Sequence, residues 1–453
     1  MRKGIMGLVV IACLILSGFA AAGIASAKEV KLTIWAIGPD NPSFWRAKAF
    51  NVAIDRLNKI LGATGSDVKI VGNVSFETVS WGDYRTRALL AFKSGKGPDI
   101  YTTGHEDIGM LADAGYIIPL DKYINKYKWY FDSFFPNLWN SVKLKGKIYG
   151  IPQDTEARMI YIRKDALKKM GWSDEKIKKF IEAGWKGEIT LEDILKVGAG
   201  AKKKGIVKWG FYHRPTPGVD YFQIYLAYGG RMWDPDTGKL VLSEKAALET
   251  LKFFYDAVNT YKITPSGMTS VSWKSIHKAV VNGDVLFWLG GSWNWAEWQR
   301  DYNASEDYLF KNIAFIPIPP GKKGGKPVTI SHPVVYMVSS TCKNPDLAVA
   351  LIGMALAPDL NTKHAVTSGH LAISYKQLGL PEYNKAKFLS MVTPLLKFTR
   401  FAPNHPKFNT YNKEGWYKAI QMVEVNGAKP EKALSFLKSI LKRKLKGALT
   451  IEP

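Results

Sequence analysis

Tryptophans next to paired glycines are the residues of this sequence whose type and spacing best suit ligand binding. Four tryptophans occur within residues 288–298, and Gly290 and Gly291 stand just ahead of Trp293. Glycine accepts backbone conformations that other residues avoid, so this pair allows a tight turn after a predicted strand. An aromatic ring at such a turn can stack on the apolar face of a hydroxylated ring compound such as a sugar. We therefore expect Gly291, Ser292 and Trp293 to contact a ligand of this kind; ordinary core packing of the ring is the alternative.

Polar candidates for hydroxyl binding follow predicted strands in the first part of the chain. They are Asp40 and Asn41 after the first strand, His105 and Glu106 after the third, and Glu156 and Arg158 farther along. Tyr221 and Trp233 flank Gly229-Gly230 and could add stacking surfaces. For each carboxylate the alternative is a solvated loop or a salt bridge with a nearby arginine. For the two aromatic residues it is core packing.

The sequence lacks the compact motifs of common hydrolases and metalloenzymes. It has no His-Glu-x-x-His zinc motif, no Gly-x-Ser-x-Gly nucleophile turn and no phosphate-binding loop. The stretch Gly104-His105-Glu106-Asp107 begins like a zinc motif, but its second histidine is absent. We predict no catalytic residue, no metal site and no cofactor. A secreted carbohydrate-active enzyme stays an alternative, because such chemistry depends on a carboxylate spacing of about 5 to 10 Å in the folded protein.

Alternating strands and helices must position these residues. Predicted strands at 32–36 and 68–74 and one opening at 98–101 alternate with helices, a pattern that favours a mostly parallel sheet with ligands at the carboxyl ends of its strands. Longer helical patterns follow at 191–204, 243–258, 273–281, 345–356, 415–425 and 430–445, with short strands at 285–289, 313–316 and 334–338. The fold class that these elements predict is α/β.

The N-terminus, the length and the cysteine content indicate an exported protein of two domains. Two basic residues, an apolar stretch at 7–16 and the small residues Ala25-Ser26-Ala27 are typical of a signal peptide, 1–27, cut before Lys28. The apolar stretch is shorter than the roughly 20 residues of a membrane-spanning helix. Beyond it the chain has one cysteine, Cys342, so no internal disulfide can form. A chain of this length is expected to form two domains.

The strongly basic composition raises the question of a polyanionic partner. The net charge is +24, but the lysines are dispersed in short groups such as Lys168-Lys169, Lys178-Lys179 and Lys202-Lys203-Lys204. Nucleic-acid sites are marked by clustered basic stripes rather than by dispersed charge. We interpret the lysines as solvated surface and predict no nucleic-acid partner.

Short motifs occur in a fixed order along nearly the whole chain. They are Trp81-Gly82-Asp83-Tyr84, Gly95-Lys96-Gly97-Pro98-Asp99-Ile100, Ala114-Gly115-Tyr116-Ile117-Ile118-Pro119-Leu120, Gly146-Lys147-Ile148-Tyr149-Gly150-Ile151-Pro152, Met159-Ile160-Tyr161-Ile162-Arg163-Lys164-Asp165, Asn282-Gly283-Asp284, Gly290-Gly291-Ser292-Trp293 and Lys429-Pro430-Glu431-Lys432-Ala433-Leu434. In this order, behind a signal peptide, they resemble the family 1 extracellular solute-binding proteins, which include the maltose-binding and related sugar receptors.

The resemblance implies a type II periplasmic-binding-protein-like fold. Two lobes, each a mixed sheet flanked by helices, would be joined by chain segments that cross between them beside a ligand cleft. The N-terminal lobe would comprise residues 28–155 and 333–373, and the C-terminal lobe 156–332 and 374–453. The crossings would supply the hinge for closure around a ligand.

The resemblance also implies roles for individual residues. Trp293 and Trp416 match sugar-stacking tryptophans, Glu156 matches a carboxylate that binds sugar hydroxyls, and Glu106 falls where an acidic contact is common. Trp81, in the first motif, is a further candidate. The chain departs from the maltose receptors at Thr103, where they have a stacking tryptophan, and at Pro39-Asp40, where they have an Asp-Lys pair. Maltose itself is therefore not the implied ligand.

The implied function is that of the extracytoplasmic substrate-binding component of an ABC transporter. Such a protein would deliver a sugar or polyol to a membrane permease without transforming it. We expect a monomer that is periplasmic or associated with the outer cell surface. A receptor for an anionic or phosphorylated solute, or for a peptide, stays open because His105, Arg158 or Arg231 could pair with an anion.

Overall fold

The computed structural model describes residues 28–38 and 41–453. The predicted signal peptide and Asp40 lie outside the described residues, and so does the side chain of Asn41. The chain divides into two compact units. The first consists of the described part of Met1–Thr155 together with Pro333–Leu389, and the second of Glu156–His332 and Ser390–Pro453.

One segment groups differently from the predicted boundaries. Residues 374–389 belong to the first unit, where the resemblance implied the second lobe. Ser374 forms a β-bridge with Phe134, and the backbone N–H of Tyr375 donates to the carbonyl of Ser133. The Gln377 amide donates to Asn361 Oδ1 at 2.9 Å. These hydrogen bonds hold the segment on the first unit.

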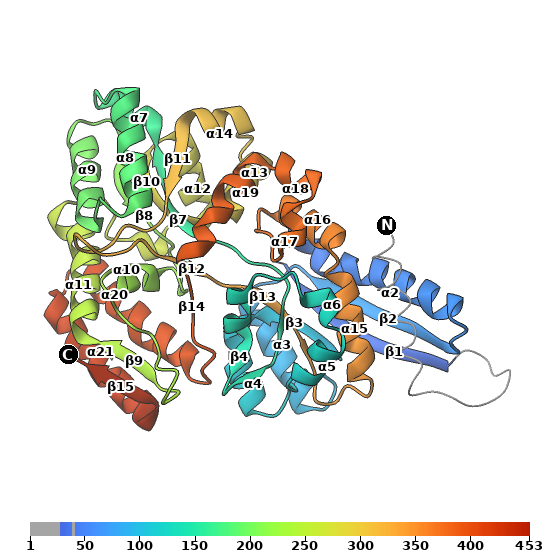
Figure 1. Cartoon of the computed structure of the whole chain (residues 1–453). Coiled ribbons are helices and arrows are strands. Elements are labelled where there is room, and N and C mark those ends of the chain that lie inside the picture. The colour runs from blue at the N-terminus through green and yellow to red at the C-terminus, as the bar shows by residue number, and fades with distance from the viewer. Residues whose placement is uncertain (1–27, 39–40) are drawn as a thin grey trace. The chain divides into compact units, whose positions relative to one another are not determined.

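The first unit is built on a mixed five-stranded sheet in the order β2-β1-β3-β13-β6 (Figure 1). The strands are β1 (Lys28–Ile37), β2 (Val68–Glu77), β3 (Ile100–Gly104), β6 (Ile151–Pro152) and β13 (Val334–Val338). β1 is parallel to β2 and β3, whereas β13 is antiparallel to β3 and β6. The sheet is thus parallel at one side and antiparallel at the other.

Helices whose apolar residues recur at helical spacing pack on this sheet. In α2 (Trp45–Ala63) the buried residues Phe50, Ala53, Leu57 and Leu61 follow one another at intervals of three and four, and the helix packs against β2 and α15. α15 (Pro345–Ala355) is buried from Leu347 to Ala355, as expected of a helix that is apolar on all sides. Other helices of this unit are α3 (Trp81–Lys93), α4 (Ile108–Asp113), α5 (Asp121–Lys126), α6 (Lys128–Phe131), α16 (Pro358–Ser368), α17 (Tyr375–Leu378) and α18 (Pro381–Lys385).

The second unit has a four-stranded sheet in the order β11-β7-β10-β8. Its strands are β7 (Arg158–Arg163), β8 (Trp209–Tyr212), β10 (Val285–Gly291) and β11 (Ile313–Ile316). β7 is antiparallel to β10 and β11, and β8 is parallel to β10. Two small parallel pairs join β12 (Thr329–Ser331) to β14 (Thr399–Phe401) and β9 (Leu240–Ser243) to β15 (Leu449–Glu452).

Helices surround this second sheet and close its core. They include α7 (Lys164–Lys169), α8 (Asp174–Lys186), α9 (Leu191–Lys203), α10 (Tyr221–Ala227), α11 (Glu244–Tyr255), α12 (Trp273–Asn282), α13 (Trp293–Asp301), α14 (Glu306–Asn312), α20 (Tyr417–Glu424) and α21 (Pro430–Leu445). α11, α20 and α21 pack on one another. Each unit is therefore a mixed sheet flanked by helices, which confirms the predicted fold class. In the described part of the chain, no helix combines the length and the apolar character needed to cross a membrane.

Candidate functional site

A buried arginine at the start of β7 organises the candidate site of the second unit. The Arg158 guanidinium donates through Nε to Asp220 Oδ1 at 3.1 Å and through Nη1 to Glu156 Oε1. All three side chains are at most 6% exposed. The backbone N–H of Arg158 donates to Thr329 Oγ1 at 2.9 Å, and that of His332 donates to Glu156 Oε1 at 3.1 Å. The Thr329 side chain of β12 and the His332 backbone just after it thus hold the two partners of this ion pair.

A second arginine completes the charge balance. Arg214 pairs with the other carboxylate oxygen of Asp220, and its Nε donates to the carbonyl of Thr216 at 2.7 Å. Burial alone would raise the pKa of Asp220, but Arg214 and Arg158 outweigh it and lower the pKa to about 2. Asp220 is therefore ionised at neutral pH. Two arginines and two carboxylates leave the cluster without net charge.

Tryptophan rings lie against both arginines of this cluster. The Cζ atom of Arg158 is 5.0 Å from the centroid of the Trp293 ring, and that of Arg214 is 5.7 Å from the centroid of Trp273. Trp293 is partly exposed and Trp273 is 39% exposed. Guanidinium groups over aromatic faces gain a cation–π attraction, which helps to fix the rings. The cluster therefore combines hydrogen-bonding groups with accessible aromatic surface.

The turn from β10 into α13 places Trp293. The Asn294 side-chain oxygen accepts the backbone N–H of Gly291 at 2.9 Å and the indole N–H of Trp288 at 3.0 Å. The backbone N–H of Ser292 donates to the carbonyl of Ala157 at 2.9 Å. A Cβ atom at residue 291 would lie 1.9 Å from the Trp293 ring, so only glycine permits this approach.

A comparable cluster occurs in the first unit at the end of β3. Arg85 of α3 donates to Glu106 Oε1 at 2.6 Å and to Asp107 Oδ2 at 2.5 Å, and Thr103 Oγ1 donates to Asp107 Oδ2 at 2.6 Å. Burial raises the pKa of Asp107 and the Glu106 charge adds to this, although Arg85 opposes the shift. The Trp81 ring lies 5.7 Å from the Cζ atom of Arg85.

Each unit by itself brings together some of the predicted site residues. Trp81 and Glu106 belong to the Arg85 cluster, whereas Glu156, Arg158 and Trp293 belong to the Arg158 cluster. Gly291 and Ser292 are buried in the turn next to Trp293, and their contact with a ligand stays a prediction. His105 is 0% exposed in the first unit, next to Glu106.

Two aromatic candidates lie in the core of the second unit, contrary to the stacking role expected of them. Trp416 is 0% exposed and packs on Tyr225, with ring centroids 4.7 Å apart, and on Phe222. Tyr221 is 1% exposed, and its hydroxyl donates to the Arg214 carbonyl at 2.7 Å. A ring enclosed on all sides has no face for a sugar, so core packing, the alternative reading, describes both residues.

The remaining aromatic candidate lies elsewhere on the second unit. Trp233 is partly exposed and forms a β-bridge with Leu240. The interactions of the Arg158 cluster do not include it. Its role in ligand binding stays a prediction.

Sequence reasoning missed the residues that hold these clusters in place. Asp220 pairs with both Arg158 and Arg214, the Trp273 ring lies against Arg214, and Arg85 pairs with both Glu106 and Asp107. The only local signal for the two missed carboxylates is their position: Asp220 is adjacent to the predicted Tyr221, and Asp107 is adjacent to the predicted Glu106. Arg158 and Asp220 are 62 residues apart, and no local sequence pattern links them.

Comparisons with known proteins agree with this architecture. The profile of the family described as bacterial extracellular solute-binding protein matches residues 47–361. A binding protein of Brucella abortus (strain 2308) is 24% identical over 397 residues, which are 86% of this chain and 87% of the relative. The maltodextrin-binding protein MdxE of Bacillus subtilis (strain 168) is 26% identical over 290 residues, 62% of this chain and 60% of the relative.

A solved structure shows the same fold over nearly the whole length. The sugar-binding protein MalE from Xanthomonas citri superposes with a TM-score of 0.73 at 18% identity, covering 92% of this chain and 98% of that protein. The family match extends over more than half of the chain. The family predicted from the ordered motifs is thereby confirmed, and the chain belongs to the bacterial extracellular solute-binding proteins.

Proposed function

We propose that this protein binds a sugar or polyol as the solute receptor of an ABC importer. The observation that carries the proposal is the Arg158 cluster, in which a partly exposed tryptophan lies against an arginine held between two carboxylates. A sugar offers apolar C–H faces and a rim of hydroxyls that donate and accept hydrogen bonds. Trp293 matches the first requirement, and the guanidinium and carboxylates match the second.

The charge balance of the cluster favours an uncharged ligand. Arg158 and Arg214 are both paired with carboxylates, so neither has an excess positive charge to offer to an anion. Breaking such buried pairs to bind a phosphate would leave a carboxylate without its partner, which costs several kcal/mol. Carboxylates and guanidinium groups already in place can instead exchange hydrogen bonds with hydroxyls and keep their charges compensated.

We propose that the Arg85 cluster of the first unit contributes to binding in the same way. Trp81 supplies an aromatic ring, and Glu106 supplies a carboxylate that Arg85 holds at 2.6 Å. The two clusters are similar in composition although they come from different units. Each cluster therefore offers an aromatic ring and hydrogen-bonding groups of the kinds that a hydroxylated ligand needs.

The relatives support the ligand class. The Bacillus subtilis relative is named for maltodextrin binding, and the Xanthomonas citri structure is of a sugar-binding protein. The family is one of binding proteins, which argues against the secreted enzyme considered above. We propose that this chain is exported, acts at the outer face of the cell membrane and delivers its ligand to a permease.

The anion receptor has less support. Arg231, one of the residues considered for it, is exposed and pairs with Glu452. Arg158 is neutralised in the cluster described above. We therefore do not propose an acidic or phosphorylated ligand, and the thermal-shift screen described next includes organic phosphates to test for one.

A thermal-shift screen of the chain from Lys28 to Pro453 tests the ligand class directly. A ligand that binds only the folded state raises the melting temperature, so mono- and oligosaccharides, polyols and organic phosphates can be compared in parallel. We expect stabilisation by one sugar or polyol, and its recovery unchanged after incubation. Stabilisation only by organic phosphates would instead indicate an anion receptor. Chemical conversion of the compound would indicate a carbohydrate-active enzyme.

Matched tryptophan variants then test the site. Trp172 is the control for Trp293, because both rings are partly exposed in the second unit and both lie under a cation, Lys176 Nζ being 4.4 Å from the Trp172 centroid. We expect Trp293→Ala to weaken calorimetric affinity at least about tenfold, or about 1.4 kcal/mol. Trp172→Ala should bind as the unmodified protein does. Equal affinity of both variants would remove Trp293 from the site.

A further inference from the structure

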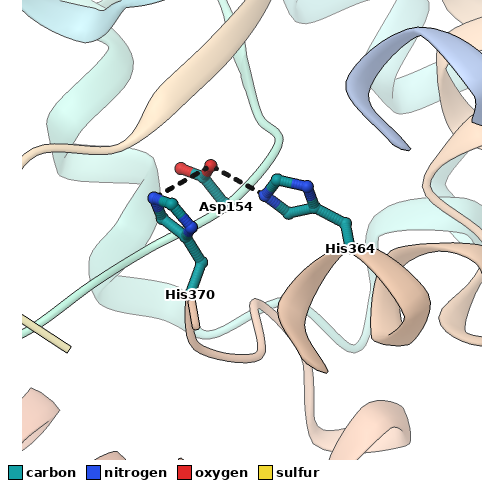
Figure 2. Close-up of side chains that lie close together, drawn as sticks. All are labelled: Asp154, His364 and His370. Atoms are coloured by element: carbon teal, nitrogen blue, oxygen red, sulfur yellow. Dashed lines mark hydrogen bonds and ion pairs between the residues drawn. The ribbon is translucent and has the colours of Figure 1, made fainter. Parts of the chain in front are cut away.

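We propose that Asp154, His364 and His370 form a binding site for a divalent transition metal ion, with Zn²⁺ as the best fit. One ligand atom from each residue lies within 4.8 Å of the others. Asp154 Oδ2 is 3.1 Å from Nε2 of His364 and 3.8 Å from Nε2 of His370, and Figure 2 shows both rings directed at this carboxylate. Metal–ligand bonds of about 2.0 to 2.1 Å in a tetrahedral zinc site separate neighbouring ligand atoms by about 3.3 Å, close to these two spacings.

The backbone brings the two imidazoles together at the end of one helix. His364 lies in the last turns of α16, which ends at Ser368. Gly369 takes a left-handed conformation with φ of 76°, so the chain reverses and returns His370 toward the helix. The two rings are then 5.2 Å apart between centroids. Asp154 comes from the segment just after β6, so the site joins two parts of the first unit that are 210 residues apart.

Hydrogen bonds around the cluster orient His370 and Asp154, whereas His364 Nε2 must release the proton that it donates to Asp154 Oδ2 when a metal binds. Ser368 Oγ donates its proton to the His364 carbonyl at 2.6 Å, so it must accept from Nδ1–H of His370, 2.8 Å away. This leaves Nε2 of His370 with its lone pair directed toward Asp154. The backbone N–H of Val334 donates to Asp154 Oδ1 at 2.9 Å and orients the carboxylate. Partners of this kind orient the ligands in many metal sites.

The ligand set selects the metal class. Two imidazoles and one carboxylate suit Zn²⁺ and related ions rather than Mg²⁺ or Ca²⁺, which prefer oxygen ligands. Asp154 and His364 are at most 2% exposed, whereas the His370 side chain is 11% exposed. His370 is thus the least enclosed of the three ligands, and a water molecule as the fourth ligand would enter beside it. The ion would fasten the segment after β6 to α16.

The guanidinium of Arg46 lies next to the proposed metal site and competes for the same carboxylate. Arg46 Nη2 donates to Asp154 Oδ2 at 2.8 Å, and the same guanidinium is held by Gln153 Oε1 at 3.1 Å and by the Ile37 carbonyl at 3.0 Å. Its positive charge opposes binding of a metal at the same oxygen. Removing that charge in Arg46→Gln should therefore tighten zinc binding, whereas a purely structural role of the cluster predicts no zinc binding with or without Arg46.

Calorimetric titration with ZnCl₂ tests the site. The chain from Lys28 is used without a histidine tag, which would itself bind zinc, after removal of bound metal with a chelator. We expect one Zn²⁺ per chain and an affinity at least about tenfold weaker in His364→Gln and in His370→Gln. His405→Gln is the matched control, because this histidine lies in the second unit and outside the cluster. It should bind zinc as the unmodified protein does.

Two further measurements keep the result decisive. Ser368→Ala keeps all three ligands but removes the hydroxyl that accepts from His370 and donates to the His364 carbonyl, so we expect it to weaken zinc binding about tenfold. The visible spectrum of Co²⁺ in place of Zn²⁺ should show a bound, four-coordinate ion that is lost in His370→Gln. Absence of stoichiometric binding, or equal binding by all the variants, would overturn the proposal, and neither result would bear on sugar binding, which is tested by other residues.

Discussion

The guanidinium of Arg158 lies over the ring of Trp293, with its Cζ atom 5.0 Å from the ring centroid. Arg158 is the first residue of β7 and lies opposite Gly291, the last residue of β10. Trp293 is the first residue of α13 and follows Gly291 by two residues, so its ring lies beside the end of this strand pair. The register of these two strands therefore sets the position of the ring relative to the cation, and Glu156 and Asp220 hold that cation in place.

Replacing Gly291 by alanine should displace the Trp293 ring. The added Cβ would lie 1.9 Å from the nearest ring atom, far inside van der Waals contact, and Arg158 lies over the ring. The ring must therefore move away from its place beside the ion pair. We expect calorimetric affinity for the sugar or polyol identified by screening to fall about tenfold or more, equivalent to about 1.4 kcal/mol.

Gly267→Ala is the control for this substitution. A Cβ at residue 267 meets nothing within 4 Å, and the φ angle of −90° is open to any residue. Gly267 also lies in the second unit. This variant should keep the affinity of the unmodified protein. If Gly291→Ala binds the ligand equally well, the position of the Trp293 ring does not determine binding.

Replacing Asp220 by asparagine should destabilise the second unit strongly. Asp220 is 5% exposed and compensates both Arg158 and Arg214, so the substitution leaves Arg214 without this carboxylate and leaves the buried Arg158 with Glu156 alone. Loss of one member of a buried pair typically costs about 3 to 5 kcal/mol. Urea denaturation followed by circular dichroism measures this change in the free energy of unfolding.

An exposed ion pair gives the comparison for Asp220. Asp174 is 83% exposed and pairs with Lys168 at 2.7 Å on the surface of the second unit. Surface pairs contribute at most about 1 kcal/mol, so Asp174→Asn should leave the denaturation midpoint almost unchanged. A loss in Asp220→Asn no larger than that of Asp174→Asn would show that solvent compensates the two arginines.

Much of the fold could be predicted because its signals are local. The alternation of buried and exposed residues in β1 and the three-and-four spacing of apolar residues in α2 are visible in the sequence. The ordered motifs indicated the family to which the chain belongs. The grouping of residues 374–389 could not be predicted, since it depends on the β-bridge from Ser374 to Phe134 and on hydrogen bonds to distant residues.

The candidate site was less predictable because burial decides which aromatic residues are available. Trp293 and Trp416 are both tryptophans that follow a glycine-containing stretch, yet the first is partly exposed and the second is 0% exposed. The difference comes from Tyr225 and Phe222, which enclose Trp416 and precede it by almost 200 residues. In the same way, the approach of His364 to Asp154 depends on a contact across 210 residues that no motif records.

The buried His277 should make folding of the second unit sensitive to acid. The indole N–H of Trp298 donates to its Nδ1 at 3.1 Å, so the neutral ring carries its proton on Nε2, which faces Glu297 Oε1 at 3.4 Å. Burial lowers the pKa of His277 to about 4, against 6.5 for the unperturbed side chain, although the Asp301 charge opposes the shift. Between these values the unfolded chain binds a proton that the folded chain does not, so this contribution to stability is complete above pH 6.5 and is lost as the pH falls.

The expected loss is about 1.4 kcal/mol per pH unit, and about 3 kcal/mol in all between pH 6.5 and pH 4. Urea denaturation at several pH values measures it, and His277→Gln isolates it from the carboxylates that titrate in the same range. Glutamine can accept the Trp298 hydrogen bond but cannot be protonated, so the variant should lose less stability on acidification than the unmodified protein. Parallel pH profiles for the two proteins would mean that Glu297 stabilises protonated His277 enough to cancel the cost of its burial.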